Sequence, residues 1–258
     1  MPYTAIFTQT QNNVALITLN RPRRRNAITH AMLDELAQAL KIAAKDKRSR
    51  AIVLTGAEHS FCAGQDLAEF GEESSPNYVY KHVLRSYRPV IQLLTTIEKP
   101  IIAAINGVAA GAGASLALAC DLRIMAADAS LLLAFSNIAL LPDAGATWFL
   151  VRAVGYSRAY EIAIEGEKIS AKRCLELGLT NKIAPAGELL PAALKWAEKL
   201  AQRPTFSLGL TKRAMNKANT ISLAQAIEYE AHLQQLAAEH PDFAEGVAAF
   251  VEKRPPVW

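Results

Sequence analysis

The chain of 258 residues is poor in cysteine, in net charge and in metal-binding patterns, and each shortage excludes a class of protein. Its cysteines, Cys62, Cys120 and Cys174, are odd in number and far apart, so we expect reduced thiols in a cytoplasmic protein and no disulfide framework. A net charge of only +4 does not indicate a nucleic-acid partner. The five histidines lack the spacing of metal ligands, so we expect no metal site.

Long apolar runs are also missing. No stretch has the roughly 18 uninterrupted apolar residues that a transmembrane helix needs, because the longest candidate, residues 101–119, is broken by Asn106 and three glycines. The first residues lack a basic stretch followed by an apolar run, so we expect no secretory signal and no membrane partner. The composition, 51% apolar and 20% charged, is sufficient for a large buried core.

Short apolar runs alternate with helical patterns up to about residue 185, and this alternation predicts a mostly parallel sheet covered by helices. The expected strands are residues 5–7, 14–19, 51–54, 101–105, 122–126, 131–134 and 179–184. The expected helices are one capped by Thr29 and then residues 78–97, 116–119, 144–154, 157–165, 170–177, 189–202, 206–217, 223–238 and 243–253. A polar stretch at residues 69–76 is expected to be a surface loop.

The most informative segment is the Gly/Ala-rich stretch from Asn106 to Ser115, which joins an expected strand to an expected helix. With so little side-chain bulk, its backbone can approach a ligand closely, and its free N–H groups can face a developing negative charge. A second junction, residues 60–67, follows the strand at 51–54. On neighbouring parallel strands the two junctions open at the same end of the sheet, and each can supply one N–H to an oxyanion hole. The alternative is a pair of tight turns.

Asp143 is the candidate acid–base residue, in the sequence Leu140-Leu141-Pro142-Asp143-Ala144-Gly145. Such a sequence is a common turn, and the aspartate can cap the helix that follows. If it faces an apolar pocket instead, the loss of solvation raises its pKa, as a base or proton shuttle requires.

Other patterns are weaker. Gly111 and Gly113, with Asp128 beyond them, resemble the start of a dinucleotide-binding fingerprint, but its third glycine is missing. Cys62 is expected to be a packing residue. The basic run at residues 21–25 is either a solvated loop or a contact for phosphate.

Taken together, these segments resemble the enoyl-CoA hydratase/isomerase (crotonase) superfamily from end to end. The matching pieces are Leu19-Asn20-Arg21-Pro22 with Asn26-Ala27; Phe61-Cys62-Ala63-Gly64-Gln65-Asp66-Leu67; Asn106-Gly107-Val108-Ala109-Ala110-Gly111; Leu141-Pro142-Asp143 with Gly145; and Glu245-Gly246 with Ala249-Phe250 and Lys253-Arg254. The resemblance implies an α/β fold, a spiral of ββα units with a C-terminal helical region used in trimerisation. We expect residues 1–195 to form the core with the acyl-CoA site and residues 196–258 to form the oligomerisation region of a trimer or dimer of trimers.

The family binds acyl-CoA thioesters and stabilises their enolates through two backbone N–H groups, which by position belong to Gln65 and Ala112. Coenzyme A arrives as part of the substrate, and the resemblance implies no separate cofactor. The residues implied to contact substrate or coenzyme A are Arg23, Arg25, Ala27, Ala63, Asp66, Leu67, Gly111 and Pro142. Because the oxyanion hole would be built from backbone, we expect Gln65→Ala to cost little activity.

The departures from the family pattern indicate the reaction. Hydratases of this family place glutamates at the position of Ser115 and near Phe135, and neither carboxylate is present here. With Asp143 in their place, the chain is most similar to the ring-epoxide isomerases of phenylacetate degradation. This implies conversion of 1,2-epoxyphenylacetyl-CoA into its oxepin, or a Δ3-to-Δ2 double-bond shift in enoyl-CoA chains. The alternatives are an enoyl-CoA hydratase of fatty-acid or aromatic degradation, an inactive acyl-CoA binder, and a nucleotide-dependent oxidoreductase.

Overall fold

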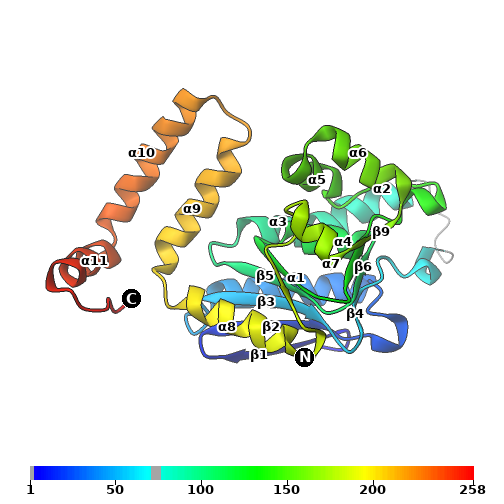
Figure 1. Ribbon diagram of the computed structural model, residues 1–258, viewed down its shortest axis with the longest axis horizontal. Coiled ribbons are helices and arrows are strands. Elements are labelled where there is room, and N and C mark those ends of the chain that lie inside the picture. Colours follow the sequence, from blue (N-terminus) through cyan, green and yellow to red (C-terminus); the bar gives the residue numbers. More distant parts are fainter. Residues whose placement is uncertain (1–2, 71–76) are drawn as a thin grey trace.

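A computed structural model describes residues 3–70 and 77–258 of the chain (Figure 1). The strands are β1 (Ile6–Gln11), β2 (Val14–Leu19), β3 (Ala51–Gly56), β4 (Ser60–Cys62), β5 (Ile101–Ile105), β6 (Val108–Ala110), β7 (Leu122–Ala126), β8 (Ser130–Leu132), β9 (Lys168–Ser170) and β10 (Lys182–Ala184). The helices are α1 (His30–Lys45), α2 (Tyr78–His82), α3 (Arg88–Thr96), α4 (Ala112–Ala119), α5 (Ala146–Val154), α6 (Tyr156–Glu165), α7 (Ala171–Glu176), α8 (Leu189–Ala201), α9 (Thr205–Ala218), α10 (Leu223–Glu239) and α11 (Pro241–Glu252).

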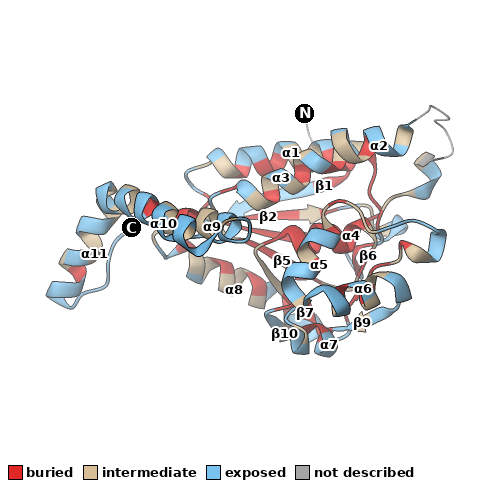
Figure 2. Ribbon diagram, turned by 90° about the horizontal axis from the view of Figure 1, so that it is seen from above, coloured by how far each residue is buried: buried red, intermediate tan, exposed pale blue. Residues whose placement is uncertain are grey.

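The larger sheet has six strands in the order β1-β2-β3-β5-β7-β10. Its pairs are parallel except for β1 with β2, so the expectation of a mostly parallel sheet is confirmed. Every residue of β3 and of β5 is buried, as in a sheet covered on both faces. Helices α1 and α8 lie on opposite sides of these strands (Figure 2).

A second sheet of four strands, β4-β6-β8-β9, lies beside the first. The sequence patterns did not predict β4, β6 or β9, because three residues are too few to show a hydrophobic period. Strands β3, β5 and β7 of the large sheet are each followed by a short strand of the small one. This alternation, with helices between the units, confirms the expected spiral of ββα units.

Several boundaries differ from expectation. Strand β1 extends to Gln11 because its residues after Ile6 are exposed and are held by pairing with β2. The expected strand at 179–184 is limited to Lys182–Ala184, and the helix expected from 144 begins at Ala146. Thr29 caps α1 as expected, accepting a 3.2 Å hydrogen bond from the Met32 N–H. Of the loop expected at 69–76, residues 71–76 lie outside the described residues.

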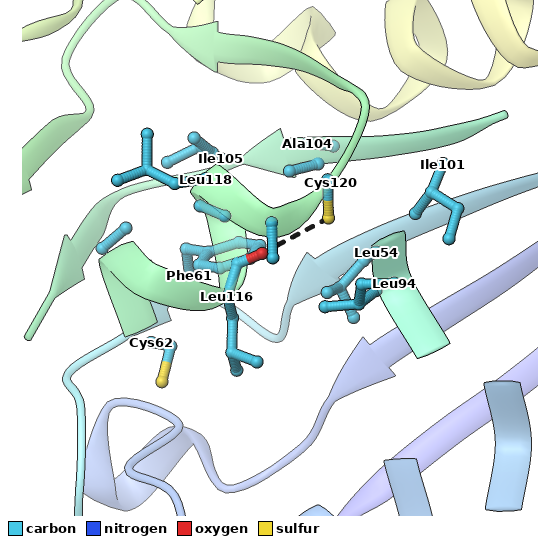
Figure 3. Close-up of a cluster of buried hydrophobic side chains, with 14 of the residues drawn as sticks. Leu54, Phe61, Cys62, Leu94, Ile101, Ala104, Ile105, Leu116, Leu118 and Cys120 are labelled. Atoms are coloured by element: carbon cyan, nitrogen blue, oxygen red, sulfur yellow. Dashed lines mark hydrogen bonds between the residues drawn. The ribbon is translucent and has the colours of Figure 1, made fainter. Parts of the chain in front are cut away.

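The buried core extends under the two strand-to-helix junctions. Phe61 and Cys62 of β4 lie against α4, where Leu116 points into the same apolar cluster (Figure 3). Gly113 is needed at this contact, because a Cβ there would overlap the Cys62 side chain and carbonyl. The first turn of α4 is therefore packed directly on the first residues of the other junction.

The C-terminal helices α9, α10 and α11 extend away from the body of the molecule (Figure 1). They leave apolar side chains exposed, among them Phe243, Val247, Phe250 and Val251. Helix α8, which runs through residue 195, packs on the large sheet. That residues 1–195 form the core with the acyl-CoA site and residues 196–258 the oligomerisation region stays a prediction. Over the described part of the chain, no helix is long and apolar enough to cross a bilayer.

Candidate active site

The two junctions predicted from the sequence lie side by side. Strands β3 and β5 are parallel neighbours, and so are β4 and β6, which bring the junctions to the same edge. A Cβ on Gly64 would lie 2.9 Å from the Ala110 carbonyl oxygen and 3.5 Å from the Ala112 nitrogen. Gly64 also has a φ of +94°, a backbone conformation that L side chains rarely adopt. A glycine is therefore required where the two loops meet.

The direction of the Gln65 N–H follows from its neighbour. The Gly64 carbonyl accepts a 2.8 Å hydrogen bond from the Ile28 N–H, and the Asp66 N–H donates at 2.8 Å to the Ile28 carbonyl. In a planar trans peptide the N–H points opposite to the C=O, so the Gln65 N–H points away from Ile28. It finds no acceptor within residues 3–70 and 77–258.

The Ala112 N–H is oriented by helix α4. The Gly111 carbonyl points along the helix and accepts a 3.1 Å hydrogen bond from the Ser115 N–H, so the Ala112 N–H points out of the helix N-terminus. Gly111 itself is fixed by a 2.8 Å hydrogen bond from its N–H to the Leu132 carbonyl of β8. In the described part of the chain, the Ala112 N–H also has no acceptor.

A cavity of about 210 Å³ brings the three proposed reaction residues together: Gln65, Ala112 and Asp143 all line it. Most of the other lining residues are apolar. The full set is Ala63, Gly64, Leu67, Val79, His82, Val83, Tyr87, Gly111, Ala134, Phe135, Asn137, Ile138 and Leu140. Such a wall suits an apolar acyl group.

Asp143 does not cap a helix, so the capping interpretation was wrong. Helix α5 begins after Gly145, and no side chain caps it. The Asp143 carboxylate oxygen Oδ1 is buried without a hydrogen-bond partner among the described residues. Burial raises the pKa of Asp143 to about 6, against a smaller opposing effect of its own backbone amide. The turn that aims the side chain has two left-handed residues, Ala144 with φ +48° and Gly145 with φ +82°.

Of the described residues that line the cavity, Asp143 is the one carboxylate. Ser115 is fully buried, and its hydroxyl lies 3.0 Å from the Asp143 carbonyl oxygen. Phe135 contributes an apolar wall. The cavity therefore lacks the pair of carboxylates that the resemblance assigns to hydratases.

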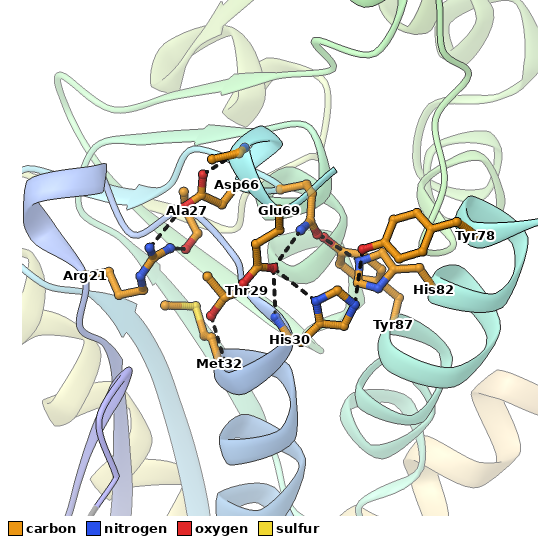
Figure 4. A network of polar contacts seen from close by, with 12 residues as sticks. Arg21, Ala27, Thr29, His30, Met32, Asp66, Glu69, Tyr78, His82 and Tyr87 are labelled. Carbon is orange, nitrogen blue, oxygen red and sulfur yellow. Dashed lines mark hydrogen bonds and ion pairs between the residues drawn. The ribbon is translucent and has the colours of Figure 1, made fainter. Parts of the chain in front are cut away.

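Polar side chains behind Gln65 were missed by the sequence analysis (Figure 4). The Tyr87 hydroxyl donates a 2.5 Å hydrogen bond to Gln65 Oε1, and His82 Nε2 lies 3.0 Å from the same oxygen. Gln65 Nε2 lies 3.4 Å from Glu69 Oε2, which in turn lies 3.1 Å from His30 Nδ1. The presence of His and Tyr in the expected helix at 78–97 was a signal, but α-helical spacing gave no reason to place both on one face.

The remaining predicted contact residues fall into two groups. Ala63, Leu67 and Gly111 line the cavity. The others lie outside its lining: Arg23 and Arg25 are exposed, Ala27 is buried, and Asp66 and Pro142 are half-buried.

Asp66 has a partner within the protein. Its Oδ2 lies 2.9 Å from the Arg21 guanidinium, and this hydrogen bond holds the pKa of Asp66 below its usual range. Arg21 also donates a 2.6 Å hydrogen bond to the Ala27 carbonyl. The pair thus ties the 21–27 loop to the Gln65 junction, and the expected contact of Asp66 with coenzyme A stays a prediction.

Cys62 is not placed for nucleophilic chemistry. It is fully buried, and burial raises the pKa of its thiol to about 12. Asp128 of the weak dinucleotide pattern is exposed, and Gly113 is used for packing.

Comparison with known proteins places these features in context. Residues 9–258 match the family described as enoyl-CoA hydratase/isomerase. The 1,2-epoxyphenylacetyl-CoA isomerase of Escherichia coli (strain K12) is 41% identical over 254 residues, 97% of each chain. A probable enoyl-CoA hydratase of Rhodobacter capsulatus is 40% identical over 257 residues, 99% of this chain and 98% of that one. The crystal structure of an enoyl-CoA hydratase from Polaromonas sp. JS666 is similar with a TM-score of 0.94 and 35% identity, covering 98% of this chain and 99% of that chain.

Proposed function

The chain belongs to the enoyl-CoA hydratase/isomerase family, and on this premise we propose that it is an acyl-CoA isomerase whose proton shuttle is Asp143. The observation that supports an isomerase most directly is the carboxylate content of the cavity. Among the described lining residues, Asp143 is the one carboxylate, and burial raises its pKa to about 6. A single carboxylate can take a proton and return it, whereas the hydratases of the resemblance use two.

In the proposed reaction the thioester carbonyl oxygen accepts hydrogen bonds from the N–H groups of Gln65 and Ala112. For a Δ3-enoyl thioester, Asp143 removes a proton from C2, and the electron pair of that C–H bond forms a dienolate whose charge rests on the thioester oxygen. Protonated Asp143 then returns the proton to C4, and the double bond ends between C2 and C3. Atoms and electrons balance without an added oxidant or reductant.

The second part of the proposal concerns the substrate. The relative named 1,2-epoxyphenylacetyl-CoA isomerase is 41% identical along almost the whole chain, and we propose that this protein also acts on that ring epoxide, giving the oxepin. The apolar wall formed by Leu67, Phe135 and Leu140 is suited to a planar hydrocarbon ring. The alternative, an enoyl-CoA hydratase, is supported by the relative named a probable hydratase at 40% identity.

Coenzyme A would lie outside the cavity, its phosphates near the exposed Arg23 and Arg25. The part of coenzyme A next to the thioester would pass along residues 63–67, where Ala63 and Leu67 line the cavity. We also propose that the chain assembles through its C-terminal helices into a trimer or a dimer of trimers.

The test is a panel of thioesters assayed without NAD. Purified protein is mixed with trans-3-hexenoyl-CoA, crotonyl-CoA and 1,2-epoxyphenylacetyl-CoA, and products are identified by mass spectrometry in deuterated water. We expect isomerisation of the first and third, with little water added to crotonyl-CoA. Faster hydration of crotonyl-CoA than isomerisation of either other ester would favour the hydratase. Binding without any conversion would identify an inactive acyl-CoA binder.

A further inference from the structure

We infer that Tyr87, with His82 beside it, is a positioning residue that holds the Gln65 backbone N–H in place through the Gln65 side chain. This rests on the proposed function, in which that N–H binds the enolate oxygen. Gln65 is held on two sides. Its backbone is bound through the Ile28 bridge. Its side-chain oxygen accepts a hydrogen bond from the Tyr87 hydroxyl at 2.5 Å and lies 3.0 Å from His82 Nε2, and Figure 4 shows Tyr87 and His82.

The protonation states suit this arrangement. Tyr87 is 2% exposed, and burial raises its pKa well above the usual range, so its hydroxyl keeps its proton. Burial, and then the nearby His30, lower the pKa of His82, so its imidazole is neutral and Nε2–H can donate. Since an amide oxygen has two acceptor sites, these two donors fill it. The side-chain oxygen of Gln65 is therefore occupied within the protein.

The helical segment that contains His82 and Tyr87 departs from α-helical geometry between these two residues. Residues Val83–Tyr87 form a π-helical turn between α2 and α3, closed by the Arg88 N–H donating to the Val83 carbonyl. In an α-helix, with 3.6 residues per turn, residues five apart point in clearly different directions. An i→i+5 turn brings such residues above one another. His82 and Tyr87, five apart, can thus reach the same oxygen.

The consequence is that loss of these bonds should weaken the oxyanion hole while leaving its N–H groups in place. Once the side chain is released, the Ile28 bridge is the one hydrogen-bonded restraint that the described residues still give the peptide between Gly64 and Gln65. A displacement of well under an ångström at that peptide lengthens the hydrogen bond to the enolate oxygen. The structure thus argues against our expectation that Gln65→Ala would cost little.

Acetoacetyl-CoA provides a direct probe, because its enolate absorbs in the near ultraviolet and its keto form does not. The experiment measures, at saturating ligand, the fraction of bound acetoacetyl-CoA present as enolate between pH 6 and 9. The variants are Tyr87→Phe and Gln65→Met, which both keep the N–H of Gln65. We expect each to lower the bound enolate-to-keto ratio about tenfold at a fixed pH, that is, to raise the pKa of the bound ligand by about one unit.

The matched control is Thr55→Val. Thr55 is a buried hydroxyl that donates a 2.8 Å hydrogen bond to the Ala104 carbonyl, away from the cavity lining. Its loss should lower the melting temperature without changing the bound enolate fraction. The double variant Tyr87→Phe/Gln65→Met should match Gln65→Met alone, because both changes remove the same connection.

The outcomes distinguish failure of the positioning role from failure of the proposed function. If wild-type protein forms the enolate and the two variants change only melting temperature or affinity, the positioning role is wrong and the proposed function stands. If the wild type binds acetoacetyl-CoA without forming enolate, the proposed function fails and this inference with it. Should Tyr87→Phe not fold, Gln65→Met supplies the same measurement.

Discussion

The Ser115 hydroxyl lies 3.0 Å from the Asp143 carbonyl oxygen and 3.4 Å from the Gly111 carbonyl oxygen. Ser115 belongs to α4, whose first residue, Ala112, lines the cavity. One buried hydroxyl thus connects the proposed oxyanion hole to the turn that aims the proposed proton shuttle. The hydroxyl of a serine donates to this carbonyl, whereas the carboxylate of the hydratase pattern, once ionised, has no proton to donate.

Replacing that hydroxyl should loosen the Asp143 turn. We expect Ser115→Ala to destabilise the protein by about 0.5–1.5 kcal/mol, the net contribution of one hydrogen bond, since the Asp143 carbonyl still accepts from the Ala146 N–H. We also expect it to lower the isomerisation rate severalfold. Chemical denaturation and steady-state kinetics on trans-3-hexenoyl-CoA measure both effects. An unchanged rate in a destabilised variant would mean that Ser115 is structural and has no influence on Asp143.

Asp143→Asn tests the proton shuttle itself. The amide keeps the size of the side chain but cannot accept the proton, so we expect a rate loss on the order of 10²–10⁴ with binding of the CoA ester retained. Asp128→Asn, at an exposed carboxylate, is the matched control and should leave the rate unchanged. A variant at position 143 with more than roughly a tenth of the wild-type rate would contradict the role.

The raised pKa of Asp143 makes the activity dependent on pH. Because the carboxylate form is the base, kcat/KM should fall about tenfold per unit as the pH drops below about 6. A pH–rate profile of the free enzyme on a Δ3-enoyl-CoA ester measures this limb. A profile that is flat between pH 5 and about 8 would exclude this residue as the base.

The same group should affect stability with a defined sign. Burial raises the pKa of Asp143 from the usual 3.8 to about 6, so the folded state binds this proton more tightly than the unfolded state. Its cost is absent below about pH 4, grows as the pH rises from about 4 to about 6, and is complete above about 6. Asp143→Asn should therefore melt at the wild-type temperature in acid and above it at about pH 8, as calorimetry can measure.

Ala112→Pro tests the backbone donor. Proline is tolerated at the first position of a helix, which Ala112 occupies, but it has no N–H. We expect the rate to fall by about 10²–10³, while Ala112→Gly, which keeps the donor, stays within a few-fold of wild type. Equal rates for the two variants, measured under the same conditions, would show that this N–H does not bind the oxyanion.

The exposed apolar residues of the C-terminal helices predict assembly. Phe250 is 85% exposed and Val251 72%, more than a soluble monomer tolerates in a cluster. Light scattering should give a mass of three or six chains, and Phe250→Asp should reduce it, whereas Phe7→Asp, at an exposed phenylalanine of β1, should not. A wild-type mass near 28.0 kDa at micromolar concentration would contradict the prediction.

Local sequence was sufficient for the features whose cause is local. Continuous apolar runs identified β3 and β5, and a threonine cap identified the start of α1. The absence of a side chain at Gly113 identified a close approach to Cys62, whereas a Cβ at Gly111 would meet nothing within 4 Å. The order of motifs led to the family. The Pro-Asp-x-Gly context made Asp143 a candidate but favoured a helix cap, and the family resemblance supplied the catalytic role.

Tertiary structure alone decided the features that depend on distant contacts. Strands β4, β6 and β9 form because neighbours pair with them, and three residues contain no period to detect. The pKa of Asp143 depends on walls contributed by several elements, and the direction of the Gln65 N–H depends on Ile28, which is 37 positions earlier in the chain. The π-helical turn that brings His82 and Tyr87 to one amide oxygen is likewise invisible in the sequence, because α-helical periodicity assigns them to different faces.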